Sequence, residues 1–282
     1  MKMNVLAVQM SSVLGDTRAN YAKIDSLIEN FYSENQNDGS NLPDLIVLPE
    51  VWTTGWYCDI FKDSADSFGE TEEFLSKIAR KHYVNIIGGS YIRGVNGVCK
   101  NTSPVFDRSG RHIARYDKIH LYAPDGEAKA VVPGDTPVIV EIDGVKTGLS
   151  ICYDIRFPEL FRSYINSGFA PELMINMSAW PLSRKEQYGI MAASRAIENQ
   201  CYFLALSQTG HIKGNANNSG NSLIVDPMGN IIEKLGEKEG YIYTKINTEI
   251  VEQTRKTFPN LLNRRVHNFG FTPEIAGELN RV

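Results

Sequence analysis

Cysteine is scarce in this sequence, and the motifs that bind structural metals or phosphate groups are missing. The chain of 282 residues holds four cysteines, Cys58, Cys99, Cys152 and Cys201, which form no CxxC pair and are too few for a disulfide framework. A helix-borne HExxH pair, a Gly-x-Ser-x-Gly elbow and a phosphate-binding GxxxxGK(S/T) loop are also absent. We therefore expect reduced thiols, a cytoplasmic location and no bound metal.

The sequence also lacks an excess of positive charge and any long apolar segment. It has 29 lysines and arginines against 33 aspartates and glutamates, for a formal net charge of −4. This balance gives no general attraction to nucleic acids or anionic membranes. No segment approaches the roughly 20 apolar residues that span a bilayer, and the apolar run at the N-terminus is too short for a signal peptide. We therefore expect neither nucleic acid nor a membrane among its partners.

Strand and helix patterns alternate along the chain without an internal repeat, which favours a single domain over residues 1–282. Short apolar or β-branched runs predict strands at NVLAVQM, DLIVLP, VNIIGGSYI, TPVIVEI, KTGLSIC, ELMINMS, CYFLALSQ, NSLIVDP and YIYTKI. Helices are predicted at 18–32, 68–82, 156–167, 184–199 and about 248–256. The segment VCKNTSPVFDRSGRHIARYDK indicates two antiparallel strands joined by an Asp-Arg-Ser-Gly turn. The predicted class is α/β, with mixed sheets and helices outside.

The segment LSICYDIRFPEL places a cysteine where an apolar strand meets a helix. The strand GLSIC ends at Cys152, and the helix that follows begins near Pro158, a residue suited to a first helical turn. A thiol at such a junction can face a cleft, and nearby backbone N–H groups favour its thiolate form. The alternative is that Cys152 is a small buried hydrophobic residue, as most free cysteines are.

Two further segments carry charged residues at positions suited to catalysis. The apolar strand in DLIVLPEVW delivers Glu50 at its carboxyl end, where ligand sites gather in open α/β sheets, although a glutamate there can also simply face solvent. In YDKIHLY, Lys118 and His120 lie two residues apart and share one face of an extended segment. A lone lysine is usually a solvated charge. His120 suggests a Cys–His pair with Cys152, but the CGxCW surroundings of papain-like enzymes are absent.

In this order, PE at 49–50, YDKIHLY at 116–122 and ICYDIRFPEL at 151–160 resemble the nitrilase (carbon–nitrogen hydrolase) superfamily. Similar stretches continue along nearly the whole chain: NMSAWP, SRAIENQCY, GNSLIVDPMG and FPNLLNRR. The pattern most resembles the omega-amidase branch and related bacterial hydrolases of small amides. The resemblance implies a four-layer α-β-β-α sandwich that forms a homo-oligomer, commonly a dimer, with a C-terminal tail at about 258–282 that contacts a partner subunit.

The resemblance also implies a Glu–Lys–Cys triad, which falls on Glu50, Lys118 and Cys152. Many members have a second glutamate between the lysine and the cysteine. Glu127, in PDGEAKAVVPGD, is the matching position, and it would hold the lysine. The backbone N–H of Tyr153 is implied as a second oxyanion donor.

The implied reaction is the hydrolysis of the carbon–nitrogen bond of a small amide by water, with release of ammonia and without metal or organic cofactor. Glu50 would accept the thiol proton, Cys152 would attack the carbonyl to form a thioester, and Lys118 would stabilise the oxyanion. A nitrilase or an N-carbamoyl-amide hydrolase of the same family would use the same triad. The alternative of another class is a catalytically idle binding protein, against which the intact triad argues.

The residues that select the substrate are expected near the nucleophile. Omega-amidase-like substrates carry a carboxylate at the end away from the amide, and arginine is the side chain suited to hold it. Arg156 is the nearest candidate, although it could instead pair with Asp154 or Glu159. Aromatic side chains are expected to wall the pocket: Trp56, Tyr57 and Trp180. A short ω-amide of a dicarboxylic acid is the substrate that these features favour.

Overall fold

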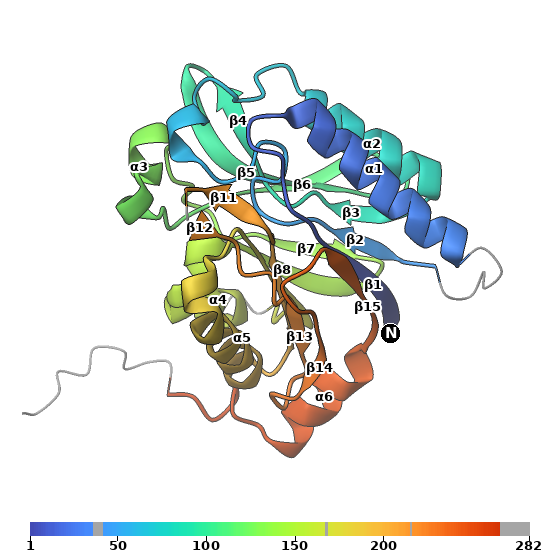
Figure 1. Cartoon of the computed structure of the whole chain (residues 1–282). Helices are drawn as coiled ribbons and strands as arrows, with labels where there is room; N and C mark the ends of the chain where they lie inside the picture. Colours follow the sequence, from blue (N-terminus) through green and yellow to red (C-terminus); the bar gives the residue numbers. More distant parts are fainter. Residues whose placement is uncertain (36–41, 167–168, 215, 266–282) are drawn as a thin grey trace, which may run out of the picture.

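Two β-sheets lie face to face in a computed structural model of the chain, and helices cover the outer face of each (Figure 1). The structure describes residues 1–35, 42–166, 169–214 and 216–265. Successive side chains of β1 (Lys2–Gln9) point to opposite faces, as in any strand. Val5 and Ala7 pack into the core between the sheets, whereas Leu6 and Val8 pack with the helices outside. The α-β-β-α layering expected from the sequence follows from this alternation.

The first sheet has seven strands in the order β15-β1-β2-β3-β5-β4, with β6 paired to β5. Besides β1, its strands are β2 (Leu45–Val47), β3 (Asn85–Ile87), β4 (Tyr91–Val95), β5 (Val98–Phe106), β6 (His112–Asp117) and β15 (Gly240–Asn247). β1, β2 and β3 are parallel, and the remaining pairs are antiparallel. β5 and β6 are the two strands predicted on either side of the Asp-Arg-Ser-Gly turn.

The second sheet has six strands in the order β14-β13-β10-β9-β8-β7. They are β7 (Ile139–Ile142), β8 (Val145–Ile151), β9 (Leu173–Ser178), β10 (Tyr202–Ser207), β13 (Leu223–Val225) and β14 (Ile231–Lys234). β8, β9 and β10 run parallel in the middle of the sheet, and its outer pairs are antiparallel. A separate hairpin is formed by β11 (His211–Lys213) and β12 (Ala216–Asn217).

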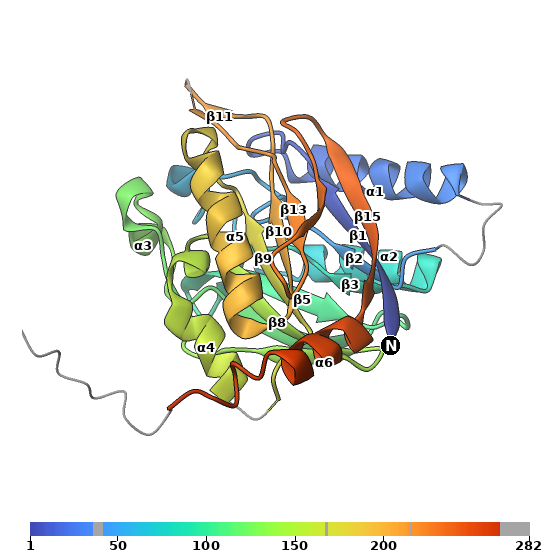
Figure 2. The same ribbon diagram turned by 90° about the horizontal axis from the view of Figure 1, so that it is seen from below.

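Four helices form the outer layers (Figures 1 and 2). α1 (Thr17–Glu34) and α2 (Glu70–His82) cover the first sheet, and α4 (Pro158–Asn166) and α5 (Lys185–Asn199) cover the second. These four helices agree with the sequence prediction within a few residues. α4 begins at Pro158 because the preceding residues form a 3₁₀ turn, η3 (Cys152–Arg156). No helix in the described residues is long and apolar enough to cross a bilayer.

Two further α-helices, α3 (Glu127–Ala130) and α6 (Thr248–Thr257), lie in the described part of the chain. α6 follows β15, as predicted, and α3 is a single turn in the connection after β6. A tail that contacts a partner subunit is expected at about 258–282. Its residues 266–282 lie outside the described part of the chain.

The carboxyl ends of the central strands of both sheets meet at one end of the sandwich. Glu50 follows β2 of the first sheet, and Cys152 follows β8 of the second. The backbone N–H of Ala179, just after β9, donates to the Glu50 carboxylate at 2.8 Å and so joins the two sheets at this end. Parallel strands place the residues that follow them at the same edge of a sheet, so the candidate site lies at this end of the sandwich.

Candidate active site

Cys152 stands at the junction of β8 and η3, in a strained backbone conformation. Its φ is +47°, in the left-handed region that residues other than glycine rarely adopt. The Asp154 carboxylate stabilises the turn by accepting hydrogen bonds from the Ile151 N–H and the Tyr116 hydroxyl, at 2.9 and 2.7 Å. Cys152 is nearly buried but lines a cavity. Strain of this kind is typical of functional sites, where the surrounding structure holds a reactive group in place.

Glu50, Lys118 and Glu127 form a fully buried cluster beside the thiol. The Lys118 ammonium donates to Glu50 Oε1 at 2.9 Å, and to Glu127 Oε1 and Oε2 at 3.0 and 2.9 Å. None of these three side chains is exposed to solvent. The Glu50 carboxylate lies close enough to the Cys152 thiol to raise the pKa of that thiol. The structure therefore brings together the three triad residues and the supporting glutamate that the sequence indicated.

Burial and neighbouring charges set the protonation of this cluster. Burial raises the pKa of Cys152 well above its ordinary value, and the Glu50 carboxylate adds to the rise. Burial also raises the pKa of Glu50, although Lys118 opposes it. Burial alone would lower the pKa of Lys118, but Glu127 and Glu50 outweigh it and raise this pKa well above its ordinary value. The resting site is therefore a neutral thiol, a carboxylate of raised basicity and an ammonium that stays charged.

Two residues that the sequence did not single out also hold Glu50. Asn101, on β5, donates from Nδ2 to Glu50 Oε1 at 3.0 Å, and Gln208, after β10, donates to the Glu50 backbone oxygen at 2.5 Å. Both contacts join segments that are far apart in the chain, so no local pattern reveals them. The one available signal was a buried strand that carries an asparagine, a residue depleted in strands.

A narrow cavity leads to the Cys152 thiol. Its walls include Trp56, Tyr153 and Trp180, and the remaining space of about 40 Å³ holds only a few water molecules. Tyr57, expected as a wall residue, does not line it, because the Lys213 ammonium contacts its ring and hydroxyl instead. The cavity is therefore suited to a small substrate with one end at the thiol.

Two arginines, Arg156 and Arg184, line the same cavity. The Arg156 guanidinium lies 5.0 Å above the Trp180 ring and donates to Gln187 Oε1 at 2.9 Å. Arg184 donates to the Tyr122 hydroxyl at 2.9 Å. Within the described residues, no carboxylate forms an ion pair with either guanidinium. Both guanidinium groups therefore remain able to bind an anion. Arg184 was not predicted from the sequence, because nothing in the segment WPLSR distinguishes this arginine from a surface one.

His120 interacts with Asp154 and forms no hydrogen bond with Cys152. Its ring Nδ1 and backbone N–H lie 2.8 and 2.9 Å from Asp154 Oδ1, and its ring stacks on Phe157 with centroids 3.8 Å apart. The Cys–His pair considered from the sequence is thus replaced by a thiol beside Glu50. Asp154 accepts hydrogen bonds from these donors, and it forms no ion pair with Arg156 in the described residues.

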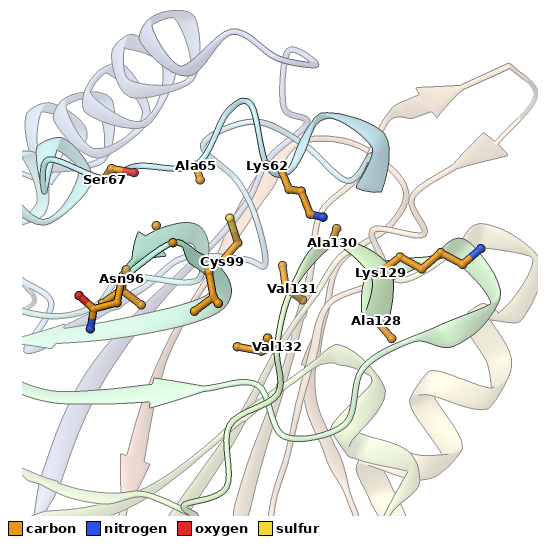
Figure 3. A pocket seen from close by; sticks show the side chains of 14 residues that line it. Lys62, Ala65, Ser67, Asn96, Cys99, Ala128, Lys129, Ala130, Val131 and Val132 are labelled. Carbon is orange, nitrogen blue, oxygen red and sulfur yellow. The ribbon is translucent and has the colours of Figure 1, made fainter.

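A larger surface cleft of about 600 Å³ shares no residue with the cavity at Cys152. Figure 3 shows the side chains of Lys62, Cys99 and Lys129 along it. Burial raises the pKa of the Cys99 thiol, so this thiol is a weak nucleophile. Within the described part of the chain, no group of three or more His, Cys, Asp or Glu side chains is arranged to hold a metal ion. The candidate catalytic thiol of Cys152 lies at the smaller cavity, not at this cleft.

A thiol beside a carboxylate base and a buried ammonium, at the end of an α-β-β-α sandwich, defines a site for acyl transfer through cysteine. Comparison with known families agrees with this class. The chain belongs to the carbon–nitrogen hydrolase family, which it matches over residues 4–256.

Known proteins with similar sequences and folds include amidases. The chain is 34% identical over 260 residues to a 2-oxoglutaramate amidase of Bacillus subtilis, with 92% of this chain and 96% of the relative covered. It is 31% identical over 280 residues to an omega-amidase of Saccharomyces cerevisiae, with 94% of each covered. A yeast structure described as branch 10 of the nitrilase superfamily has a TM-score of 0.84 at 29% identity, over 94% of this chain and 96% of that chain. The predicted resemblance to the omega-amidase branch is confirmed.

Proposed function

We propose that the protein hydrolyses the terminal amide of a short dicarboxylic acid ω-amide to the dicarboxylate and ammonia, through a thioester on Cys152. The observation that carries this proposal is the buried contact of Glu50 with Lys118 at a thiol whose cavity also holds two arginines. The 2-oxoglutaramate amidase and omega-amidase among the relatives support the same substrate class.

In the first half of the reaction, Glu50 accepts the thiol proton while the Cys152 sulfur bonds to the amide carbonyl carbon. The carbonyl oxygen becomes an oxyanion, to which the Lys118 ammonium and the Tyr153 backbone N–H donate. The three N–H bonds of the ammonium meet Glu50 Oε1 and both Glu127 oxygens, so one of the two contacts with Glu127 gives way when the oxyanion forms. The protonated Glu50 then gives its proton to the amide nitrogen, the C–N bond breaks, and ammonia departs.

In the second half, Glu50 accepts a proton from water as the water oxygen bonds to the thioester carbonyl carbon. The same two donors stabilise the second oxyanion, the C–S bond breaks, and the proton on Glu50 returns to the Cys152 sulfur. Glu127 keeps the Lys118 ammonium oriented through both halves. The Trp56 ring, 4.8 Å from that ammonium, shields it from water and strengthens its field.

Arg156 and Arg184 are the proposed anchors for the distal carboxylate of the substrate. A guanidinium binds a carboxylate through two parallel hydrogen bonds, which sets the orientation of the ligand as well as its affinity. A small substrate has few atoms with which to bind, so one such contact contributes a large share of its affinity. The aromatic contacts with Trp180 and Tyr122 hold the two guanidinium groups at the cavity.

The test compares ammonia release from glutaramate and from its methyl ester. We expect the wild type to prefer the charged substrate by about 10- to 100-fold in kcat/KM, the range of a hydrogen bond to a charged group. Arg156→Gln and Arg184→Gln should reduce that preference, whereas Arg111→Gln, on the surface, should not. Equal turnover of both substrates by the wild type would refute the carboxylate contact, and preferred turnover of a nitrile or an N-carbamoyl amide would assign another reaction of the family.

We further propose that the protein acts as a cytoplasmic homo-oligomer. The outer face of α5 supports association, because Ile190 and Ile197 are 70% and 49% exposed there. Its four free cysteines support a reducing compartment. Light scattering at several concentrations should give a mass above that of one chain, and the double variant Ile190→Lys, Ile197→Lys should lower it. A monomer at all concentrations would contradict association.

A further inference from the structure

Asn101 lies at the centre of the carboxylate cluster, on β5, with 1% of its surface exposed. Its Nδ2 donates to Glu50 Oε1 at 3.0 Å and to Glu127 Oε1 at 3.1 Å. The Lys118 ammonium donates to the same two oxygen atoms, at 2.9 and 3.0 Å. Two carboxylate oxygens and two nitrogens thus form a closed ring of four hydrogen bonds. One nitrogen carries a charge and the other does not.

The ring holds two carboxyl groups and a single ammonium, and the amide adds no charge to it. All three side chains are buried, and two carboxylates that share a site repel each other and favour uptake of a proton. A neutral N–H₂ group that donates to both carboxylates favours their ionised form without adding a charge. The amide can take only this orientation, because its oxygen would repel the carboxylates.

The backbone of Asn101 also contacts the lysine. The Asn101 backbone oxygen accepts from the Lys118 N–H at 2.9 Å, so the same residue positions the start of the lysine side chain.

We propose that Asn101 is a positioning residue of the reaction: it holds Glu50 and Glu127 together as carboxylates around Lys118, and thereby keeps Glu50 able to accept the Cys152 proton. This inference rests on the proposed function. The titratable groups that interact electrostatically with Glu50 are Lys118, Glu127, Cys152, Cys58 and Tyr188 from α5, and burial raises the pKa of Cys58 to about 12. Burial raises the pKa of Tyr188 well above its ordinary value, so it stays neutral.

Removal of the Asn101 amide is expected to shift the pKa of Glu50 in one direction, upward. Burial and Glu127 already raise the pKa of Glu50, and loss of the Asn101 amide raises it further. Since the base must be ionised to accept a proton, the acidic limb of kcat/KM against pH moves to higher pH. We expect a shift of about one to two pH units in Asn101→Ala, which corresponds to one hydrogen bond to a charged group.

The experiment measures two pH profiles for each variant: kcat/KM for ammonia release, and the rate of Cys152 alkylation by iodoacetamide, read by mass spectrometry of the Cys152 peptide. Asn101→Asp is the second variant, since a protonated carboxyl can donate to only one carboxylate, and it should shift both midpoints in the same direction. Asn85→Ala is the matched control. Asn85 is a buried asparagine on β3 of the same sheet, and its Nδ2 donates to the Asp44 backbone oxygen and to Asp143 Oδ2.

Each outcome decides the proposal. Higher midpoints in both Asn101 variants, with an unchanged midpoint in Asn85→Ala, support it. Folded Asn101 variants with the wild-type midpoints overturn it and leave the proposed function intact, even if they are less stable. If the wild type releases no ammonia from any amide, the proposed function fails, while the alkylation profile still tests whether Asn101 controls the carboxylate beside the thiol.

Discussion

Cys152 combines a strained backbone with a thiol that resists ionisation. Its φ of +47° is held by the turn, and burial raises its pKa well above the ordinary value. A neutral thiol is a poor target for oxidants and unrelated electrophiles. In the proposed mechanism the sulfur becomes a strong nucleophile when Glu50 removes its proton.

Cys152→Ala should abolish hydrolysis and leave the fold intact. Alanine has the same left-handed strain as cysteine and loses only the sulfur, so the thermal transition should stay close to that of the wild type. Without the nucleophile we expect ammonia release to fall by at least about 10³-fold. Cys99→Ser, in the separate surface cleft, should keep full activity as the control. Substantial turnover by a folded Cys152→Ala would remove the thioester mechanism.

Lys118→Arg should be nearly as damaging as Lys118→Ala. The ammonium sits within 3.0 Å of three carboxylate oxygens and 4.8 Å from the Trp56 ring centroid, which leaves no space for a planar guanidinium. Loss of an oxyanion donor lowers kcat by about 10²–10³-fold. The measurement is kcat of both variants at saturating amide. If Lys118→Arg kept more than about a tenth of the wild-type rate, the oxyanion role would be given up.

Single residues differ in how far the sequence could reveal them. Glu50 and Cys152 were candidates because each comes after an apolar strand, where α/β sheets place ligands, and the resemblance to the carbon–nitrogen hydrolases assigned their roles. Asn101 and Arg184 were not singled out, because their proposed roles depend on contacts between segments distant in the chain. Arg156 was considered because it lies close to Cys152 in the sequence.

At the scale of elements, the segments with a clear apolar pattern were predictable, including strands as short as β2 and β13, and segments without such a pattern were not. α1, α2, α4, α5 and α6 each bury an apolar stripe that the sequence displays. The single turn α3, which carries Glu127, and the hairpin β11–β12, which brings Ile212 to the cavity, are too short to show a period. These two short elements of the candidate site were therefore not predicted.

The η3 turn provides a prediction about stability. Asp154 accepts from four donors, two from His120 and one each from Tyr116 and Ile151. In Asp154→Asn one side-chain oxygen becomes an N–H₂ group that faces donors, so we expect a loss of about 1–3 kcal/mol in the free energy of unfolding. Urea denaturation measures this loss, and kcat should fall as well because the turn positions Cys152.

The control for this change is Asp107→Asn, in the turn between β5 and β6. Asp107 also accepts backbone N–H groups, but in an exposed setting where water can replace them. We expect a loss below about 1 kcal/mol there, the usual range for a surface position. Equal losses in the two variants would show that the burial of Asp154 does not matter.

At the scale of the whole molecule, the proposed reaction uses only the chain, the amide and water. In the proposed mechanism the proton transfers run through Glu50 and Lys118 stabilises the oxyanion, so no step of it calls for a metal ion. Incubation of the purified protein with a chelator, followed by dialysis, should therefore leave ammonia release unchanged. A loss of activity that a divalent metal restores would contradict this expectation.

The pairing of β1 with β15 has a consequence for the order in which the protein can form. The two strands match over their full length, from Lys2 opposite Asn247 to Gln9 opposite Gly240, so β1 is synthesised more than 200 residues before one of its two neighbours. Until residue 247 leaves the ribosome, β1 has an unpaired apolar edge, of the kind that joins other chains into aggregates. Contacts so distant in sequence also form slowly. Expression of this protein should thus depend on chaperones that cover the nascent first strand, and chains that stop before β15 should be insoluble.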